Sequence, residues 1–223
     1  MEVESEGSRD LIPEWAVVFG YLAREFRRSW WKPALELIGK AAAAAVLISL
    51  GNYALLKLGS PIGPVIFAFG LLGVCVMGQN LFTGKCGFLF ADKINWCDLL
   101  VILVVNLVAG YLIGIMYSTM DAEVAAAAAT KVAGWEFSLP FFLKAVMCGV
   151  IMYIAVFTYR KGTMLGILFG VPLFIFCGFQ HCIANVITMG VAVAFDWSLL
   201  LAVVGNFVGS LLMWAISRDI RLR

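Results

Sequence analysis

Apolar runs long enough to cross a lipid bilayer make up most of this 223-residue chain. Hydrophobic side chains account for 63% of the residues and charged side chains for only 13%. That is about half the charged fraction of a soluble domain. A helical span needs about 20 apolar residues, so the chain has room for about six spans joined by short loops. The sequence therefore predicts an all-α integral membrane protein.

Two of the expected spans are interrupted by polar residues. The span at about 62–91 contains the run GQNLFTGK at 78–85, and the span at about 163–194 contains GFQHCIAN at 178–185. The second run holds the only histidine in the chain. The uninterrupted spans are expected at about 33–58, 98–117, 139–158 and 196–217.

The interrupted spans occupy corresponding places in the two halves of the chain. Thr83 precedes Asn106 by 23 residues, and His181 precedes Asn206 by 25. With three spans in each half, the second half is inserted upside down relative to the first. The sequence thus predicts a 3+3 inverted repeat with broken helices 2 and 5, and two breaks of this kind indicate a transport site near the membrane centre.

Charge placement predicts the topology and three regions. Basic residues cluster before the first span, in the loop at 159–162 and after the last span, whereas the loop at 118–136 is acidic apart from Lys131. By the positive-inside rule both termini are cytoplasmic. Residues 1–32 form a cytoplasmic segment with an amphipathic surface helix, residues 33–217 form the pore domain, and residues 218–223 form a cytoplasmic tail.

Cysteine and histidine usage disfavours metal and redox chemistry. The six cysteines form no CxxC pair, and nearly all lie within apolar runs, as small buried side chains do. A single histidine cannot supply bis-histidine haem ligation. We therefore expect no cofactor, no metal site and no enzyme activity, and a membrane-embedded redox subunit is a weak alternative.

The interrupted spans resemble those of the formate/nitrite transporter family. Leu81-Phe82-Thr83-Gly84 is similar to the family's motif in span two, and the run at 178–185 to its motif in span five. Asn106 and Asn206 also fit, and the resemblance covers about residues 33–217. It implies an aquaporin-like fold and a homopentamer with one pore per protomer.

The resemblance also implies roles for individual residues. Thr83 and His181 would face each other in a chamber between two apolar constrictions. The cytoplasmic constriction would be formed by Leu71, Leu81 and Phe82, and the outer one by Phe67, Phe174 and Met152. Other residues assigned to the pore or substrate are Lys85, Asn80 and Gln180, and polar support for the broken helices is assigned to Asn106, Asn185 and Asn206.

Physical arguments favour an anion at these breaks. Backbone groups freed at a break are tolerated only within protein or beside water. The N-terminal end of the half-helix after the first break, with Lys85 in its first turn, favours negative charge. His181 can titrate near neutral pH and donate a proton to a weak-acid anion. The apolar constrictions favour passage of a neutral species.

The chain departs from the family pattern at several positions. Asn80 and Gln180 stand where acidic residues are common, Lys85 replaces a small polar residue, and Gly149 follows Cys148 where the family has asparagine. The first three changes make the site more positive. We hypothesise that Lys85 attracts the anion and that His181 lacks its usual acidic neighbours.

The sequence thus predicts a channel or proton-linked transporter for small monovalent anions of weak acids: formate, nitrite or hydrosulfide. Its place would be the cytoplasmic (inner) membrane of a bacterium or archaeon, and its partners would be protons and lipid, not nucleic acid. A neutral-solute pore of the water or glycerol type is the main alternative, although no Asn-Pro-Ala motif is present. A purely structural scaffold would leave the two matched breaks unexplained.

Overall fold

The computed structural model describes the backbone of residues 14–217 and the side chains of residues 32–217. Most of the described residues are helical, and none of them forms a strand. The predicted tail at 218–223 lies outside the described residues. So do the side chains of the predicted surface helix, although the backbone of residues 14–31 is helical.

By its internal contacts the chain divides into two compact units, residues 1–36 and 37–223. Helix α1 (Glu14–Leu58) begins in the first unit and ends in the second, with Pro33 inside it. The cavities and polar contacts described below lie in the second unit.

Four of the described helices are long and apolar enough to cross a membrane. They are the 32–58 part of α1, α4 (Trp96–Met120), α6 (Leu139–Arg160) and α9 (Ser198–Ser217). Side-chain caps fix two of the starts, because Asn95 accepts the Cys97 N–H before α4 and Ser138 accepts the Phe141 N–H before α6.

The remaining apolar segments are built from shorter helices. The first segment contains α2 (Ile62–Val76), α3 (Phe82–Lys85) and the 3₁₀ turn η1 (Cys86–Phe88). The second contains α7 (Leu165–Phe176) and α8 (Cys182–Val191). Both are interrupted within the runs that the sequence marks, at 78–85 and 178–185. The full six-span inverted repeat stays a prediction.

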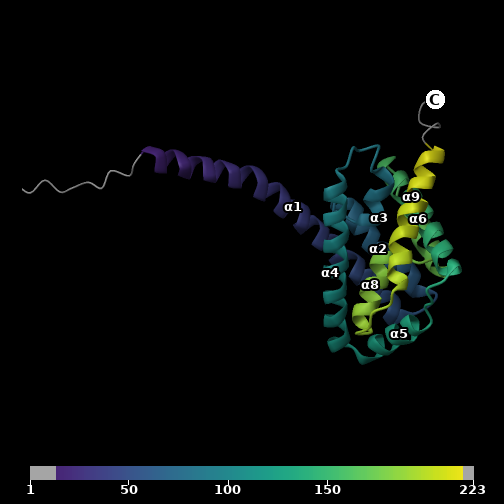
Figure 1. The fold of residues 1–223 in the computed structure, drawn as a ribbon. Helices are drawn as coiled ribbons and strands as arrows, with labels where there is room; N and C mark the ends of the chain where they lie inside the picture. Colours follow the sequence, from purple (N-terminus) through teal and green to yellow (C-terminus); the bar gives the residue numbers. More distant parts are fainter. Residues whose placement is uncertain (1–13, 218–223) are drawn as a thin grey trace, which may run out of the picture. The chain divides into compact units, whose positions relative to one another are not determined.

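Glycines allow the helices to pack closely around the two interrupted segments. Helices α6 and α9 lie side by side, and α4 packs against α8 (Figure 1). A side chain at Gly149 would collide with the Asn206 backbone, and one at Gly209 with the Val146 backbone. Gly114 lies equally close to the backbone of α8. These glycines therefore let neighbouring helices approach to backbone contact.

The loop predicted at 118–136 contains a further helix, α5 (Ala122–Ala133). Asp121 caps its start, with one carboxylate oxygen accepting from the Glu123 and Val124 N–H groups. Val124, Ala128 and Val132 recur every fourth residue and form its buried face. Helix α5 packs against α8, so the acidic loop covers the half-helix that follows His181.

Candidate functional site

Glycines end α2 and α7 in the same way. Gly78 and Gly178 have positive φ angles of 63° and 67°, a conformation that costs glycine little. After α2, the Gln79 N–H reaches back to the Val74 carbonyl at 2.8 Å, and after α7 the Phe179 N–H reaches the Phe174 carbonyl at 2.9 Å. This is the Schellman pattern of helix termination, and it occurs at matched places in the two halves.

A buried asparagine satisfies the freed backbone at the first break. The Asn106 side-chain oxygen accepts the Phe82 N–H at 2.8 Å. Its Nδ2 donates to the Ala41 carbonyl at 2.7 Å and to the Asn80 carbonyl at 3.1 Å. One amide from α4 thereby joins the break to α1.

Asn206 makes the same three contacts at the second break. Its oxygen accepts the Cys182 N–H at 2.8 Å, and its Nδ2 donates to the carbonyls of Ala145 and Gln180 at 2.8 and 2.7 Å. Both asparagines are fully buried. The structure therefore shows Asn106 and Asn206 holding the backbone at the two breaks, and neither lines the Lys85 cavity or the His181 cavity described below.

The two breaks meet at a hydrogen bond between Thr83 and His181. Thr83 Oγ1 lies 2.9 Å from His181 Nε2, and both side chains are buried. The other ring nitrogen, Nδ1, accepts the Ala184 N–H at 3.1 Å and so caps α8. An accepting nitrogen carries no proton, so the neutral ring holds its proton on Nε2 and donates it to Thr83.

Aromatic rings continue from His181. The Phe174 ring stacks on the imidazole with 5.8 Å between centroids, and Phe67 meets Phe174 edge-on at 5.9 Å. Both phenylalanines are buried. The structure thus brings Phe67, Phe174 and His181 into one continuous contact.

Two cavities open beside the breaks. One of about 130 Å³, here called the Lys85 cavity, is lined by Leu71, Val74, Cys75, Gly78, Gln79, Leu81, Gly84, Lys85, Val156, Tyr159 and Arg160. The other, of about 80 Å³ and here called the His181 cavity, is lined by Leu55, Phe67, Lys131, Phe174, Ile175, Gly178, Phe179, Gln180, His181, Ala184 and Asn185.

Positions one hundred residues apart line these two cavities. Seven positions of the first interrupted segment contribute to the Lys85 cavity, and their counterparts contribute to the His181 cavity; the matched pairs are Val74/Phe174, Cys75/Ile175, Gly78/Gly178, Gln79/Phe179, Leu81/His181, Gly84/Ala184 and Lys85/Asn185. The backbone of the two halves is therefore similar here, whereas the chemistry of the side chains differs.

The predicted constriction residues divide into two groups. Leu71 and Leu81 line the Lys85 cavity, and Phe67 and Phe174 line the His181 cavity. Two others line neither cavity. Phe82 stacks on Phe207 with 6.5 Å between ring centroids, and Met152 is buried in α6.

The remaining predicted polar residues lie close to the breaks. Lys85 lines its cavity half-buried, and its ammonium forms no ion pair with a described residue. Gln180 accepts a hydrogen bond from Asn185 Nδ2 at 3.0 Å, and both line the His181 cavity. Asn80 contributes its backbone, since its N–H donates to the Lys40 carbonyl at 3.2 Å.

Sequence reasoning missed two cationic residues that line the cavities. Lys131, near the end of α5, lines the His181 cavity; the signal for it was a single lysine in an acidic loop. Arg160 lines the Lys85 cavity. Its guanidinium forms a bidentate pair with Asp92 and lies 3.7 Å above the Phe88 ring, so it is held in place from two sides.

The described residues contain no group of three or more His, Cys, Asp or Glu side chains placed to hold a metal ion. What the site offers is a hydrogen-bonded pair, Thr83 and His181, of which His181 lines one cavity and Leu81 and Gly84, close to Thr83 in the chain, line the other. Each cavity is partly apolar and carries a lysine.

Comparison with known proteins places these features in context. The family model described as "Formate/nitrite transporter" matches residues 25–218. A Bacillus subtilis (strain 168) protein, "Uncharacterized transporter YrhG", is 27% identical over 182 residues, which cover 69% of this chain and 68% of the relative.

Two solved structures share the fold at 19% sequence identity. The first, "FNT family ion channel", has a TM-score of 0.66 and covers 91% of this chain and 94% of its own. The second, "Pentameric formate channel with formate bound", has a TM-score of 0.68 and covers 88% of this chain and 99% of its own.

Proposed function

Because the chain belongs to the formate/nitrite transporter family, we propose that it conducts small monovalent weak-acid anions, such as formate, nitrite or hydrosulfide, across the cytoplasmic membrane. It is a multi-pass membrane protein, and its family and structural neighbours are channels and transporters. The proposed arrangement has six spans in a 3+3 inverted repeat, with both termini cytoplasmic. The Lys85 cavity then faces the cytoplasm and the His181 cavity faces outward.

The Thr83–His181 hydrogen bond is the observation that carries this proposal. His181 lines the outward cavity, and Thr83 lies in the half-helix whose neighbours Leu81 and Lys85 line the inward one. In the proposed pathway this bond lies between the two cavities, where the matched breaks meet. A solute that moves between the cavities passes this pair.

The direction of that hydrogen bond leaves the Thr83 hydroxyl able to donate to an anion. His181 Nε2–H donates to the Thr83 oxygen, so the hydroxyl hydrogen of Thr83 is available to another acceptor. A small oxyanion or hydrosulfide supplies one. Leu71 and Leu81 on one side and Phe67 and Phe174 on the other make passage costly for a hydrated charge. A weak acid that gains a proton crosses as a neutral molecule.

Protonation of His181 changes the contact by which its ring caps α8. To carry a second proton the ring must take it on Nδ1, which removes the acceptor of the Ala184 N–H. A protonated His181 therefore weakens the first turn of α8. Return to the neutral ring restores that bond, so the charged state is transient.

The likeness to a solved pentameric formate channel supports a homopentamer and makes formate the first substrate to test.

Lys85 is proposed to raise the local anion concentration in the inward cavity, because its ammonium is half-buried and unpaired among the described residues. The neutral-solute pore remains the second candidate on sequence grounds and is tested in the same experiment.

The test is uptake into proteoliposomes of formate, nitrite, hydrosulfide, acetate and chloride, with and without a pH gradient. We expect selective uptake of one or more of the small weak-acid anions. Uptake should increase when the outside buffer is more acidic than the lumen. Water and glycerol permeability, followed by light scattering, provides the comparison. Uptake of none of the anions, or permeability to glycerol alone, would contradict the proposal.

A His181→Gln variant separates the two roles of the ring. Glutamine keeps an N–H donor for Thr83 but does not titrate. Uptake should persist at a reduced rate and lose its response to the pH gradient. An unchanged pH response would remove His181 from the proton pathway.

A further inference from the structure

We propose that Tyr53, Lys57 and Asp121 form a latch that positions Lys131 at the mouth of the His181 cavity, so that these three side chains set how well an anion is captured from the outward side. The inference rests on the proposed function for its direction of transport. The latch itself is a feature of the contacts between α1 and α5.

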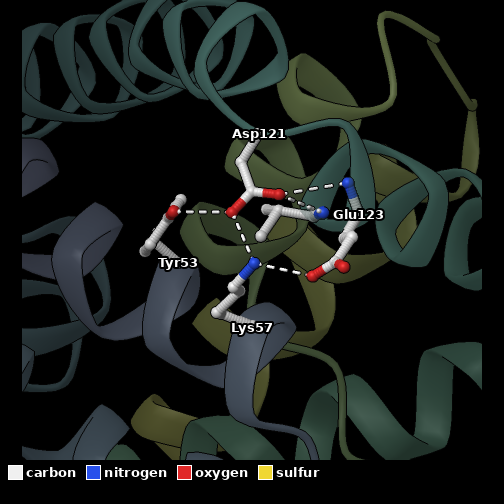
Figure 2. A network of polar contacts seen from close by, with 5 residues as sticks. Tyr53, Lys57, Asp121 and Glu123 are labelled. Carbon is white, nitrogen blue, oxygen red and sulfur yellow. Dashed lines mark hydrogen bonds and ion pairs between the residues drawn. The ribbon is translucent and has the colours of Figure 1, made fainter.

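The latch consists of short polar contacts from the end of α1 to the start of α5 (Figure 2). Lys57 Nζ lies 2.9 Å from Asp121 Oδ2, and the Tyr53 hydroxyl donates to the same oxygen at 2.9 Å. Tyr53 and Lys57 are four residues apart, so both emerge from one face of α1. Two separate donors converge on one carboxylate oxygen.

Asp121 uses its other oxygen to start α5. Oδ1 accepts the N–H groups of Glu123 and Val124 at 3.0 and 3.2 Å, while Oδ2 is held from α1. One side chain thus caps the helix and ties it to its neighbour. The hydrogen bond from Lys57 lowers the pKa of Asp121 from its ordinary value near 3.8 to about 2, so the carboxylate stays charged over the physiological range.

The members of this network differ in exposure. The Asp121 side chain is only 14% exposed and Lys57 40%, whereas Glu123, 2.7 Å from Lys57, is 83% exposed. Exposed ion pairs contribute little because water and salt screen them. The contact that matters is therefore Lys57–Asp121 with Tyr53, and Glu123 provides a control within the same network.

The last turn of α5 carries Lys131, the residue that the latch is proposed to position. Lys131 lies ten residues after Asp121 and lines the His181 cavity together with Phe67 and Phe174. Val124, Ala128 and Val132 form the buried face of α5, and α5 packs on α8. This is a single helix of 12 residues, so anchoring its first turn also fixes where its last turn presents the lysine.

A field at a cavity mouth raises the rate of anion capture without altering the interior of the pathway. Loss of the latch should therefore raise the half-saturation concentration for uptake from outside and leave the maximal rate nearly unchanged. A general packing defect would instead lower the maximal rate. The two kinetic constants distinguish a positioning role from a purely structural one.

The experiment measures anion uptake into right-side-out vesicles for Lys57→Met, Lys57→Arg, Lys131→Met and the double variant Lys57→Met/Lys131→Met. We expect Lys57→Met to raise the half-saturation concentration by up to about fivefold, the range of a partly exposed ion pair. Lys57→Arg should restore it. In the Lys131→Met background, Lys57→Met should have no further effect, because the group it positions is gone.

Three further variants serve as controls. Asp121→Asn keeps an acceptor for the helix cap but removes the charge, and should match Lys57→Met. Glu136→Gln removes one negative charge from the same region, where Glu136 is exposed, and should lower the half-saturation concentration slightly, not raise it. Glu123→Gln should do the same, because its exposed contact with Lys57 is screened.

A transport-independent measurement keeps the latch testable even if no anion is carried. Hydrogen exchange of the peptide covering residues 122–133 should be faster in Lys57→Met than in the wild type. Uptake without any anion selectivity in the wild type would overturn the proposed function, whereas unchanged exchange would overturn the latch. An equal effect of Lys57→Met with and without Lys131 would overturn the positioning role.

Discussion

At the scale of single residues, His181 is defined by what its two nitrogens contact. Nδ1 is committed to the Ala184 N–H and Nε2 to Thr83. The ring is buried, and Phe174 covers one face of it. It can therefore rotate little without breaking contacts on both sides. This rigidity makes the tautomer a property of the fold.

We predict that the neutral ring of His181 carries its proton on Nε2. Because the chain has one histidine, ¹⁵N-histidine labelling reports on a single ring. NMR at neutral pH should give one protonated nitrogen, Nε2, and one bare nitrogen, Nδ1. Thr83→Val should shift the Nε2 signal and leave Nδ1 nearly unchanged. A proton on Nδ1 in the wild type would contradict the hydrogen-bond assignment.

At the scale of elements, the two breaks depend on one side chain each. Asn106 and Asn206 use both side-chain polar atoms to satisfy three backbone groups apiece. No water has to enter for these contacts to be made. The short helices after the breaks are thereby tied to longer helices that surround them.

We predict that Asn206→Leu destabilises the fold strongly, because it leaves the buried Cys182 N–H without its partner. The expected loss is about 3 kcal/mol, given about 1–3 kcal/mol for each buried polar group left unpaired. Thermal unfolding in detergent provides the measurement. Asn106→Leu should behave alike, whereas Asn95→Ala, which removes only the cap of α4, should cost about 1 kcal/mol. Equal shifts for Asn206→Leu and Asn95→Ala would contradict the role of Asn206 in holding the break.

Much of this element-scale architecture could be predicted from local sequence. The positive-φ glycines Gly78 and Gly178 and the polar runs beside them stand out in apolar surroundings. The contacts of Asp121 and Glu123 with α1 could not be predicted, because they join residues more than 60 positions apart. In the sequence, Tyr53 and Lys57 are only two residues on one face of a helix. Their shared contact with Asp121 is visible only in the folded chain. The same limit hid Lys131, whose position depends on how α5 packs on α8.

At the scale of the whole molecule, apolar side chains cover the outside of the long helices. Exposed residues recur every fourth position on α4 at 100, 104, 108, 112 and 116, and on α9 at 200, 204, 208, 212 and 216. Surfaces of this kind face lipid or other protomers in a membrane protein. They are consistent with the proposed homopentamer, in which part of this surface lies between protomers.

We predict that native mass spectrometry in mild detergent gives a particle of five times the 24.3 kDa protomer mass. The protomer already contains both cavities and the Thr83–His181 pair, so the assembly should carry five separate sites. Substrate binding should be independent at each one. A monomer or dimer under conditions that preserve transport would contradict the pentamer.

Because lining positions one hundred residues apart correspond, each side chain of one cavity can be compared with the side chain at the equivalent position of the other. Where backbones match, a difference between inward and outward flux has its source in unlike side chains at equivalent positions. Leu81 opposite His181, and Lys85 opposite Asn185, are the most dissimilar of these pairs. For the proposed transport, these two pairs are the first candidates for reciprocal exchange between the halves, with any change in the ratio of inward to outward flux as the readout.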